Sequence, residues 1–162
     1  MKKDGGTGRR LLATNRRAEH EYFLHERLEA GIALTGTEVK SARAGSVQLR
    51  DGYVDFRNGE AFLVGVHISP YEHGHRENPP PERERKLLLN RREIDRLAGR
   101  VTAKGFTVVP LAVYAKGQRL KVELALAEGK KLYDKRETER RREMDREARE
   151  AMKTATRDVA SR

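Results

Sequence analysis

The sequence contains no cysteine and no tryptophan, and it has only five tyrosines and four phenylalanines in 162 residues. Without cysteine the chain can form neither disulfides nor thiolate metal sites, so we expect a protein of the reducing cytoplasm. No apolar run approaches the roughly 20 residues of a membrane-spanning helix, and none has the flanks of a signal peptide. We therefore expect no membrane partner.

Positive charge is concentrated at the two ends of a chain whose formal net charge is +10. Residues 1–17 hold six Lys and Arg against one acidic residue, and residues 129–162 hold twelve against eight. Residues 18–128 are nearly balanced, with seventeen against sixteen. Basic ends indicate a polyanionic partner, because neutralising phosphates releases condensed counterions. The alternative is that these ends only keep the protein soluble.

The chain changes character at Gly129, after which almost every residue is charged, polar or alanine. We predict a flexible basic arm over 1–17, a folded domain over 18–128 and a basic tail over 129–162. The tail has only a thin apolar stripe, and isolated helices of this kind are marginal. We therefore expect the tail to be disordered when free and helical on a partner.

Alternating apolar residues predict an antiparallel sheet. The segments with this pattern are 22–34, 53–57, 60–68, 85–90, 106–114 and 119–126. Asn58-Gly59 predicts a tight hairpin turn between the second and third of these. Glu26 breaks the first pattern and Pro110 interrupts the fifth, so each indicates a bulge or an edge strand. A helix remains an alternative for 22–34.

Two capping boxes predict short helices. Thr35 and Glu38 open the first, which runs to about Ala44 and carries Lys40 and Arg43 on one face. Two cations on one exposed face could contact phosphate, or they could be only the solvated side of a helix.

Asn90 and Glu93 open the second helix, predicted over 91–100. The basic residues expected to lie exposed around its N-terminus are Arg85, Lys86, Arg91 and Arg92. Helix N-termini present free amides to anions, so this cluster is a candidate site for an RNA backbone. The alternative is an ordinary capped helix with solvated arginines.

These elements together predict a mainly β fold. We expect an OB-fold-like closed antiparallel β-barrel with two or three short flanking helices, because closure removes exposed strand edges. Barrels of this type often bind oligonucleotides.

Enzymatic and metal-binding alternatives have weak support in the sequence. His73 and His75 could form a metal pair, but no third ligand is suitably spaced. Glu29, Glu38 or a histidine could serve a nuclease or an RNA-modifying enzyme, yet no pair has a recognisable catalytic spacing. We expect neither an enzyme nor a cofactor. A general single-strand RNA binder is the other alternative, although such proteins use more surface aromatics than this chain offers.

Several short motifs occur in a characteristic order between Asn15 and Arg142. They are Asn15-Arg16-Arg17, His20-Glu21-Tyr22-Phe23, Glu29-Ala30-Gly31-Ile32, Gly36-Thr37-Glu38-Val39-Lys40-Ser41, Arg43-Ala44-Gly45, Gly59-Glu60-Ala61-Phe62-Leu63, Arg85-Lys86-Leu87-Leu88-Leu89-Asn90, Gly129-Lys130-Lys131 and Asp134-Lys135-Arg136. Taken together, they resemble the small protein B (SmpB) family of bacterial trans-translation.

The resemblance implies an OB-fold barrel that holds the tRNA-like domain of transfer-messenger RNA (tmRNA, or SsrA RNA). It implies that the complex enters a stalled ribosome near the decoding centre, that the tail becomes helical in the empty mRNA channel, and that the nascent peptide is then tagged. No chemical step belongs to such a protein, and a monomer is expected in the RNA complex.

The resemblance also implies roles for individual residues. Glu29, Leu88 and Asn90 match family positions tied to tmRNA binding. Charge and position add further candidate RNA contacts, which are Arg16, Arg17, Lys40, Arg43, Lys86 and Arg91. The tail motif implied for accommodation in the ribosome comprises Gly129, Lys130, Lys131, Tyr133, Asp134, Lys135 and Arg136. Tyr133 stands where several relatives have histidine, and either ring can stack on a base.

Overall fold

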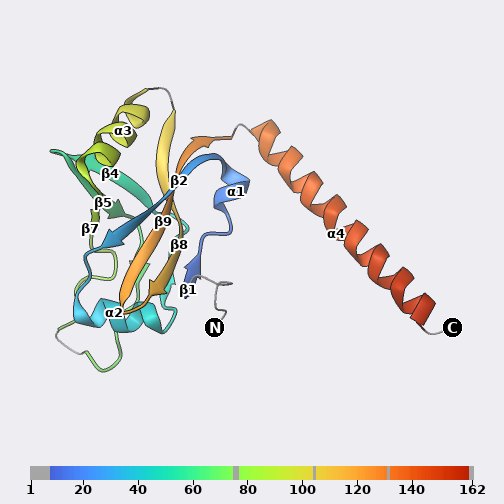
Figure 1. The fold of residues 1–162 in the computed structure, drawn as a ribbon, viewed down its shortest axis with the longest axis horizontal. Coiled ribbons are helices and arrows are strands. Elements are labelled where there is room, and N and C mark those ends of the chain that lie inside the picture. Colours follow the sequence, from blue (N-terminus) through green and yellow to red (C-terminus); the bar gives the residue numbers. More distant parts are fainter. Residues whose placement is uncertain (1–7, 75–76, 104, 131, 161–162) are drawn as a thin grey trace. The chain divides into compact units, whose positions relative to one another are not determined.

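The computed structural model describes residues 8–74, 77–103, 105–130 and 132–160, and the chain forms two compact units, Met1–Gly129 and Lys130–Arg162 (Figure 1). The elements of the first unit are β1 (Arg9–Thr14), α1 (Ala18–Glu21), β2 (Tyr22–Ile32), α2 (Gly36–Arg43), β3 (Val47–Gln48), β4 (Tyr53–Arg57), β5 (Glu60–Val64), β6 (His67–Ile68), β7 (Arg85–Leu88), α3 (Arg91–Thr102), β8 (Phe106–Lys116) and β9 (Arg119–Gly129). The second unit is the single helix α4 (Leu132–Ala160).

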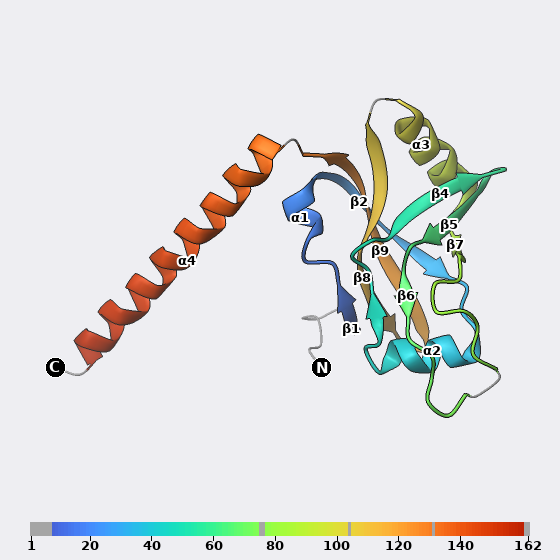
Figure 2. The ribbon, with the colours of Figure 1, turned by 180° about the vertical axis from the view of Figure 1, so that it is seen from behind.

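The main sheet has seven antiparallel strands in the order β1-β8-β9-β2-β7-β5-β4, and most of them are labelled in Figure 2. Strands β3 and β6 pair in a separate small sheet. Strands β1 and β4 are its free edges, so the prediction of a closed barrel is wrong. The short strand β4 pairs with β5, and on the inner face its Val54 joins the hydrophobic core together with Val108 of β8 and Leu124 of β9. Core packing therefore curls the sheet without the backbone pairing that closure requires.

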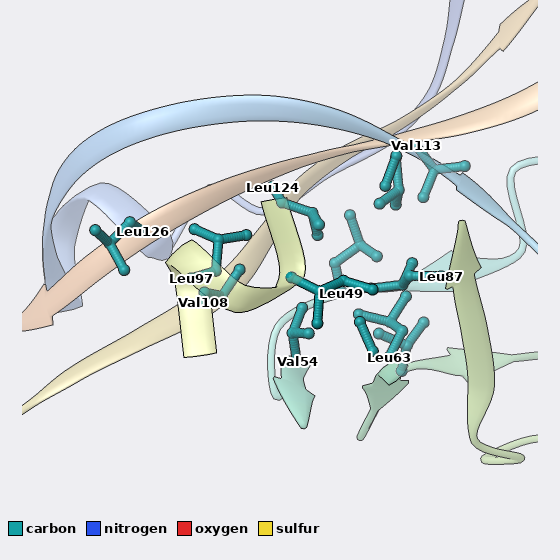
Figure 3. Close-up of a cluster of buried hydrophobic side chains, with 14 of the residues drawn as sticks. Leu49, Val54, Leu63, Leu87, Leu97, Val108, Val113, Leu124 and Leu126 are labelled. Atoms are coloured by element: carbon teal, nitrogen blue, oxygen red, sulfur yellow. The ribbon is translucent and has the colours of Figure 1, made fainter. Parts of the chain in front are cut away.

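The hydrophobic core lies on the inner face of this curved sheet (Figure 3). Alternate residues of β2, β5, β7, β8 and β9 point into it, as the period of two predicts. Helix α3 adds Ile94 and Leu97, which are 8% and 0% exposed. The opposite face carries a smaller apolar cluster, in which Ala18 of α1 packs with Val109, Leu111, Ala125 and Ala127.

Both interruptions of the strand patterns are bulges. The register of β2 against β9 shifts between Leu24 and Arg27, on either side of Glu26, and the segment is a strand rather than a helix. The register of β8 against β9 shifts between Pro110 and Ala112. Strand β1 pairs with β8 only from Ala112 to Lys116, so Pro110 lies at a bulge and also beyond the stretch of β8 that β1 covers.

The predicted hairpin turn is confirmed. Asn58 and Gly59 have φ angles of 50° and 76°, and Arg57 pairs with Glu60 across the turn. Positive φ at both central residues gives a turn whose twist matches that of the strands.

The N-terminal segment corrects the prediction of a flexible arm over residues 1–17. Residues 1–7 lie outside the described part, but Arg9–Thr14 form β1, which pairs with β8. Asn15 anchors the end of the strand, since its backbone N–H donates to the Leu111 carbonyl at 2.8 Å and its side-chain amide to the Pro110 carbonyl at 2.9 Å. The short helix α1, which the sequence did not predict, follows directly.

The second unit is one continuous helix, whereas the sequence predicts disorder in the free chain. Its large apolar side chains Met144 and Met152 are 62% and 73% exposed. None of the described α4 side chains belongs to the hydrophobic core of the first unit, and the folding of the tail on a partner stays a prediction. No helix in the described part of the chain is long and apolar enough to cross a membrane.

Candidate nucleic-acid interface

The candidate site is the outer face of the seven-stranded sheet. Glu29 and Gly31 on β2 and Lys86 and Leu88 on β7 share this face, because Gly31 is the register partner of Leu88 and side chains repeat every two residues. Two strands far apart in the sequence thus place Glu29, Lys86 and Leu88, three of the residues predicted to bind RNA, on one face.

Glu29 is held by a network that the sequence does not reveal. The Tyr114 hydroxyl donates to Glu29 Oε2, while Lys116 Nζ lies 3.5 Å from Oε1 and Arg9 Nη2 3.7 Å from Oε2. The hydrogen bond from Tyr114 is the main cause that lowers the pKa of Glu29, opposed by partial burial and helped by Lys116 and Arg9. The carboxylate therefore stays ionised and fixed in orientation.

Tyr114 is buried beneath this network, with 3% of its surface exposed. Burial raises the pKa of its hydroxyl, and the hydrogen bond to Glu29 raises it further. The Arg9 guanidinium lies over the Tyr114 ring at 4.6 Å. Tyr114 consequently remains a neutral donor and a platform for a cation.

Leu88 places an apolar surface in the middle of the polar face. Its side chain is 58% exposed, which is unusual for a leucine in a strand. A Cβ on Gly31 would lie only 3.1 Å from the Leu88 Cβ, so glycine makes room for the leucine. An exposed leucine beside cations can pack against a ribose or a base while the cations contact phosphate.

A hollow of about 450 Å³ lies between the Asn58-Gly59 turn and the start of α3. Lys86, Leu88 and Arg91 line it. Lys86 Nζ is 3.3 Å from Glu60 Oε1, and Arg91 Nε is 3.5 Å from Asp95 Oδ2. Both pairs are exposed and weak, so either cation can exchange its carboxylate for a phosphate.

Asn90 caps α3 as predicted. Its side-chain oxygen accepts from the Glu93 backbone N–H at 2.9 Å, and the Glu93 carboxylate accepts from the Asn90 backbone N–H at 3.2 Å. The cap uses the amide oxygen of Asn90, which leaves the amide NH₂ to donate to a ligand.

Arg85 corrects the prediction of an exposed basic cluster at this cap, because its side chain is fully buried. Its Nε donates to Glu38 Oε2 at 2.7 Å and its Nη1 to the Val66 carbonyl at 2.7 Å. Arg85 and Leu87 are two residues apart, and this spacing points both side chains inward. Arg85 therefore holds α2 against the sheet and does not belong to the interface.

Lys40 and Arg43 lie on α2, and each has a contact within the fold. Lys40 Nζ lies over the Tyr71 ring at 5.4 Å. Arg43 Nη2 donates to the Gln118 carbonyl at 3.2 Å, which brings Arg43 to the turn between β8 and β9. The structure does not record a contact of either residue with Leu88.

Arg16 and Arg17 lie in the turn before α1, and both are exposed. Arg17 Nη1 is 4.0 Å from Glu21 Oε1. Helix α1 packs on the sheet through Ala18, which clusters with Ala125 and Ala127 of β9. Arg16 and Arg17 thus lie near the start of β2, where this strand pairs with the end of β9.

The tail motif divides between the two units. Gly129 ends β9 as the register partner of Tyr22. Lys130 Nζ donates to Thr138 Oγ1 at 2.6 Å within the second unit. Lys131 lies outside the described residues. Tyr133 and Asp134 belong to α4, but their side chains lie outside the described part. Of the next two residues of the motif, Lys135 is half-buried and Arg136 is exposed.

The described residues contain no group of three or more His, Asp or Glu side chains arranged to hold a metal ion. His75 lies outside this part of the chain, so the His73 and His75 pair stays unassigned. An open sheet face that sets an exposed leucine among cations suits, as a class, an RNA-binding protein.

Comparison with known proteins then identifies the family. The family model for the SmpB protein matches residues 12–154. The chain is 57% identical over 149 residues to the SsrA-binding protein of Roseiflexus sp. (strain RS-1), which covers 91% of this chain and 94% of the relative. It is 50% identical over 151 residues to the SsrA-binding protein of Pelobacter propionicus, covering 93% of this chain and 99% of the relative. The chain belongs to the SmpB family.

The fold is similar to that of a solved chain from the structural work "tmRNA-SmpB: a journey to the center of the bacterial ribosome". The TM-score is 0.63 and the sequence identity 50%, over 74% of this chain and 85% of the solved one. The mainly β architecture is thus shared with an SmpB chain, although the sheet is open.

Proposed function

We propose that this protein binds the tRNA-like domain of tmRNA and delivers it to stalled ribosomes for trans-translation, so that incomplete peptides are tagged. The observation that carries the proposal is the similarity, along more than nine-tenths of the chain, to proteins named for binding SsrA RNA. The protein acts as a non-catalytic adaptor, works in the cytoplasm, and has tmRNA and the ribosome as its partners.

The outer face of the sheet supports a shape-based mode of RNA binding. Lys86 and Arg91 supply phosphate contacts, which position an RNA without reading its sequence. Leu88, the oriented Glu29 carboxylate and the Asn90 amide supply an apolar surface, an acceptor and a donor. A folded RNA that presents riboses and unpaired bases satisfies all three.

The basic tail, residues 129–162, binds the ribosome. The residues proposed for accommodation are Gly129, Lys130, Lys131, Tyr133, Asp134, Lys135 and Arg136. Eight acidic residues against twelve basic ones make the tail soluble yet still attracted to ribosomal RNA.

Competition binding tests the proposal directly. The full-length protein is titrated with tmRNA and with an unrelated RNA of the same length, at one fixed salt concentration. We expect a clear preference for tmRNA, and sequencing of the RNA that co-purifies with the protein should return tmRNA as the main species. Equal affinity for the two RNAs would leave only a general RNA binder.

A further inference from the structure

Three cations form a row across one end of the outer face. Arg9 on β1 is the register partner of Lys116 on β8, and Lys116 is the register partner of Arg119 on β9. Directly opposed side chains lie on the same face with Cβ atoms about 4.5–5.5 Å apart, where like charges destabilise a sheet. The row therefore has an electrostatic cost in the free protein.

One carboxylate partly offsets this cost. Glu29 lies within 4 Å of both Arg9 and Lys116, as described above. The neighbouring carboxylate, Glu123, is engaged by Arg27, with 3.4 Å between Arg27 Nη1 and Glu123 Oε1. Arg119 makes no recorded ion pair within the described ranges and is exposed. The row thus keeps an excess of positive charge.

Tyr114 also holds the guanidinium of Arg9 in place. The Arg9 guanidinium lies over the Tyr114 ring, 4.6 Å from its centroid, and this contact restricts the rotamers of Arg9. Arg9 Nε is shielded from solvent and has no hydrogen-bond partner among the described residues. Folding stability alone does not favour this arrangement, because an unpaired buried N–H is costly.

We infer that Arg9, Lys116 and Arg119 form a binding site for the phosphodiester backbone of RNA, completed by the edge strand β1. The inference rests on the proposed function for the identity of the RNA, but the site itself is a phosphate site. Phosphates neutralise the excess charge of the row, and the guanidinium fork of Arg9 matches phosphate oxygens. The N-terminal basic residues thus contribute through a strand that fixes Arg9 in place, and not through a free arm.

Arg57 offers a matched control on the opposite edge of the same sheet. Its guanidinium lies over the Phe62 ring at 4.5 Å, much as that of Arg9 lies over Tyr114. However, Arg57 is paired with both Asp55 and Glu84, and its register partner is Glu60. Its charge is already compensated, so its removal should matter little.

The test measures the affinity of the full-length protein for tmRNA and for the equal-length control RNA across a salt series. The variants are R9Q, R119Q and their double mutant, with R57Q as the control. Each of R9Q and R119Q should weaken binding about 5- to 10-fold near 0.1 M salt and reduce the slope of log K against log[salt] by about 1. Both RNAs should be affected equally, because phosphate contacts carry no sequence information.

Two results would overturn the inference: wild-type affinity and slope in both R9Q and R119Q, or an equal loss in R57Q. R119Q is the variant least prone to a folding defect, because Arg119 is exposed and unpaired in the described structure. Thermal unfolding measurements check that each variant is folded. A wild-type protein with no preference for tmRNA would instead overturn the proposed function, and the effect of R9Q on the salt slope would still decide the phosphate site.

Discussion

Arg85 and Glu38 form an ion pair in the interior of the protein, with 2.6 Å between Nη2 and Oε2 and with side chains that are 0% and 3% exposed. Arg83 Nη2 lies 2.6 Å from the other oxygen of Glu38, and Arg85 Nη2 also donates to the Pro81 carbonyl at 2.9 Å. Because Glu38 is also part of the cap of α2, a single carboxylate links this helix to β7 and to the segment that precedes β7.

Replacing Glu38 with glutamine should lower the free energy of unfolding by about 3–5 kcal/mol, because it leaves the buried Arg85 charge without its partner. Urea denaturation monitored by circular dichroism measures the change. The matched control is Glu60→Gln, whose partner Lys86 is half exposed, and it should change stability by about 0–1 kcal/mol. Equal losses in the two variants would show that the interior pair has no special role.

Stability should fall at acid pH because of the same carboxylate. Burial alone raises the pKa of Glu38, but hydrogen bonds from Arg83, the Thr35 backbone and Arg85 outweigh it, and the net pKa lies below its ordinary value. As the pH falls, Glu38 therefore binds a proton at a higher pH in the unfolded chain than in the folded protein. The stabilisation is complete above the ordinary glutamate pKa of about 4.3 and is lost as the pH falls through the lower folded value.

Urea midpoints between pH 3 and pH 7 test this dependence. The wild-type midpoint should decrease steeply below about pH 4.3, and the decrease should be shallower in Glu38→Gln, which has no proton to gain at this position. Glu29, whose pKa is also lowered, should leave a residual slope in that variant. Identical pH profiles for wild type and Glu38→Gln would contradict the assignment.

Truncation of Leu88 to alanine should reduce the affinity for tmRNA about 10-fold with little effect on thermal stability, because its side chain is mostly exposed in the free protein. Binding titrations at fixed salt measure the loss. Tyr53→Ala removes another exposed apolar side chain from the edge strand β4 and should leave affinity nearly unchanged. A similar loss in both variants would argue against a specific contact at Leu88.

Removal of residues 130–162 should leave the unfolding temperature and tmRNA affinity of the first unit largely unchanged, because the tail forms a separate unit. Peptide tagging on stalled ribosomes should be abolished in the same protein. Tagging at the wild-type level would show that the tail is dispensable. The paired binding measurement separates loss of delivery from loss of RNA binding.

The isolated tail should be largely disordered in dilute buffer and should become helical with ribosomes or a helix-promoting alcohol. Met144 and Met152 are 62% and 73% exposed along α4, and an isolated helix whose apolar residues remain this exposed is marginal in water. Far-ultraviolet circular dichroism of a peptide covering residues 130–162 tests this expectation. A fully helical spectrum in buffer alone would show that local interactions suffice.

Local patterns predicted most of the strands, both capping boxes and the Asn58-Gly59 turn, because each depends on a few neighbouring residues. Closure of the sheet could not be predicted in this way, since it depends on whether β1 and β4 meet. Strand β1 itself was missed because Leu11, Leu12 and Ala13 form a short apolar run between pairs of arginines. Its pairing with β8 joins residues about a hundred positions apart.

The candidate site was predicted only in part. Leu88 and Glu29 follow from the family motifs, and the sheet register brings them to one face. The Tyr114 contact with Glu29 joins residues 85 positions apart, and no local pattern indicates it. The burial of Arg85 could have been predicted, because its spacing of two from Leu87 points both side chains to the same face.

The two unpaired edges of the sheet have a consequence for the protein at high concentration. Exposed strand edges can join edge to edge between copies, which leads to aggregation. Here β1 carries adjacent arginines at 9 and 10, and β4 is five residues long with Asp55 and Arg57 along it. Two copies that approach through β1 would repel each other, so the cations inferred to bind RNA also protect the free protein from self-association.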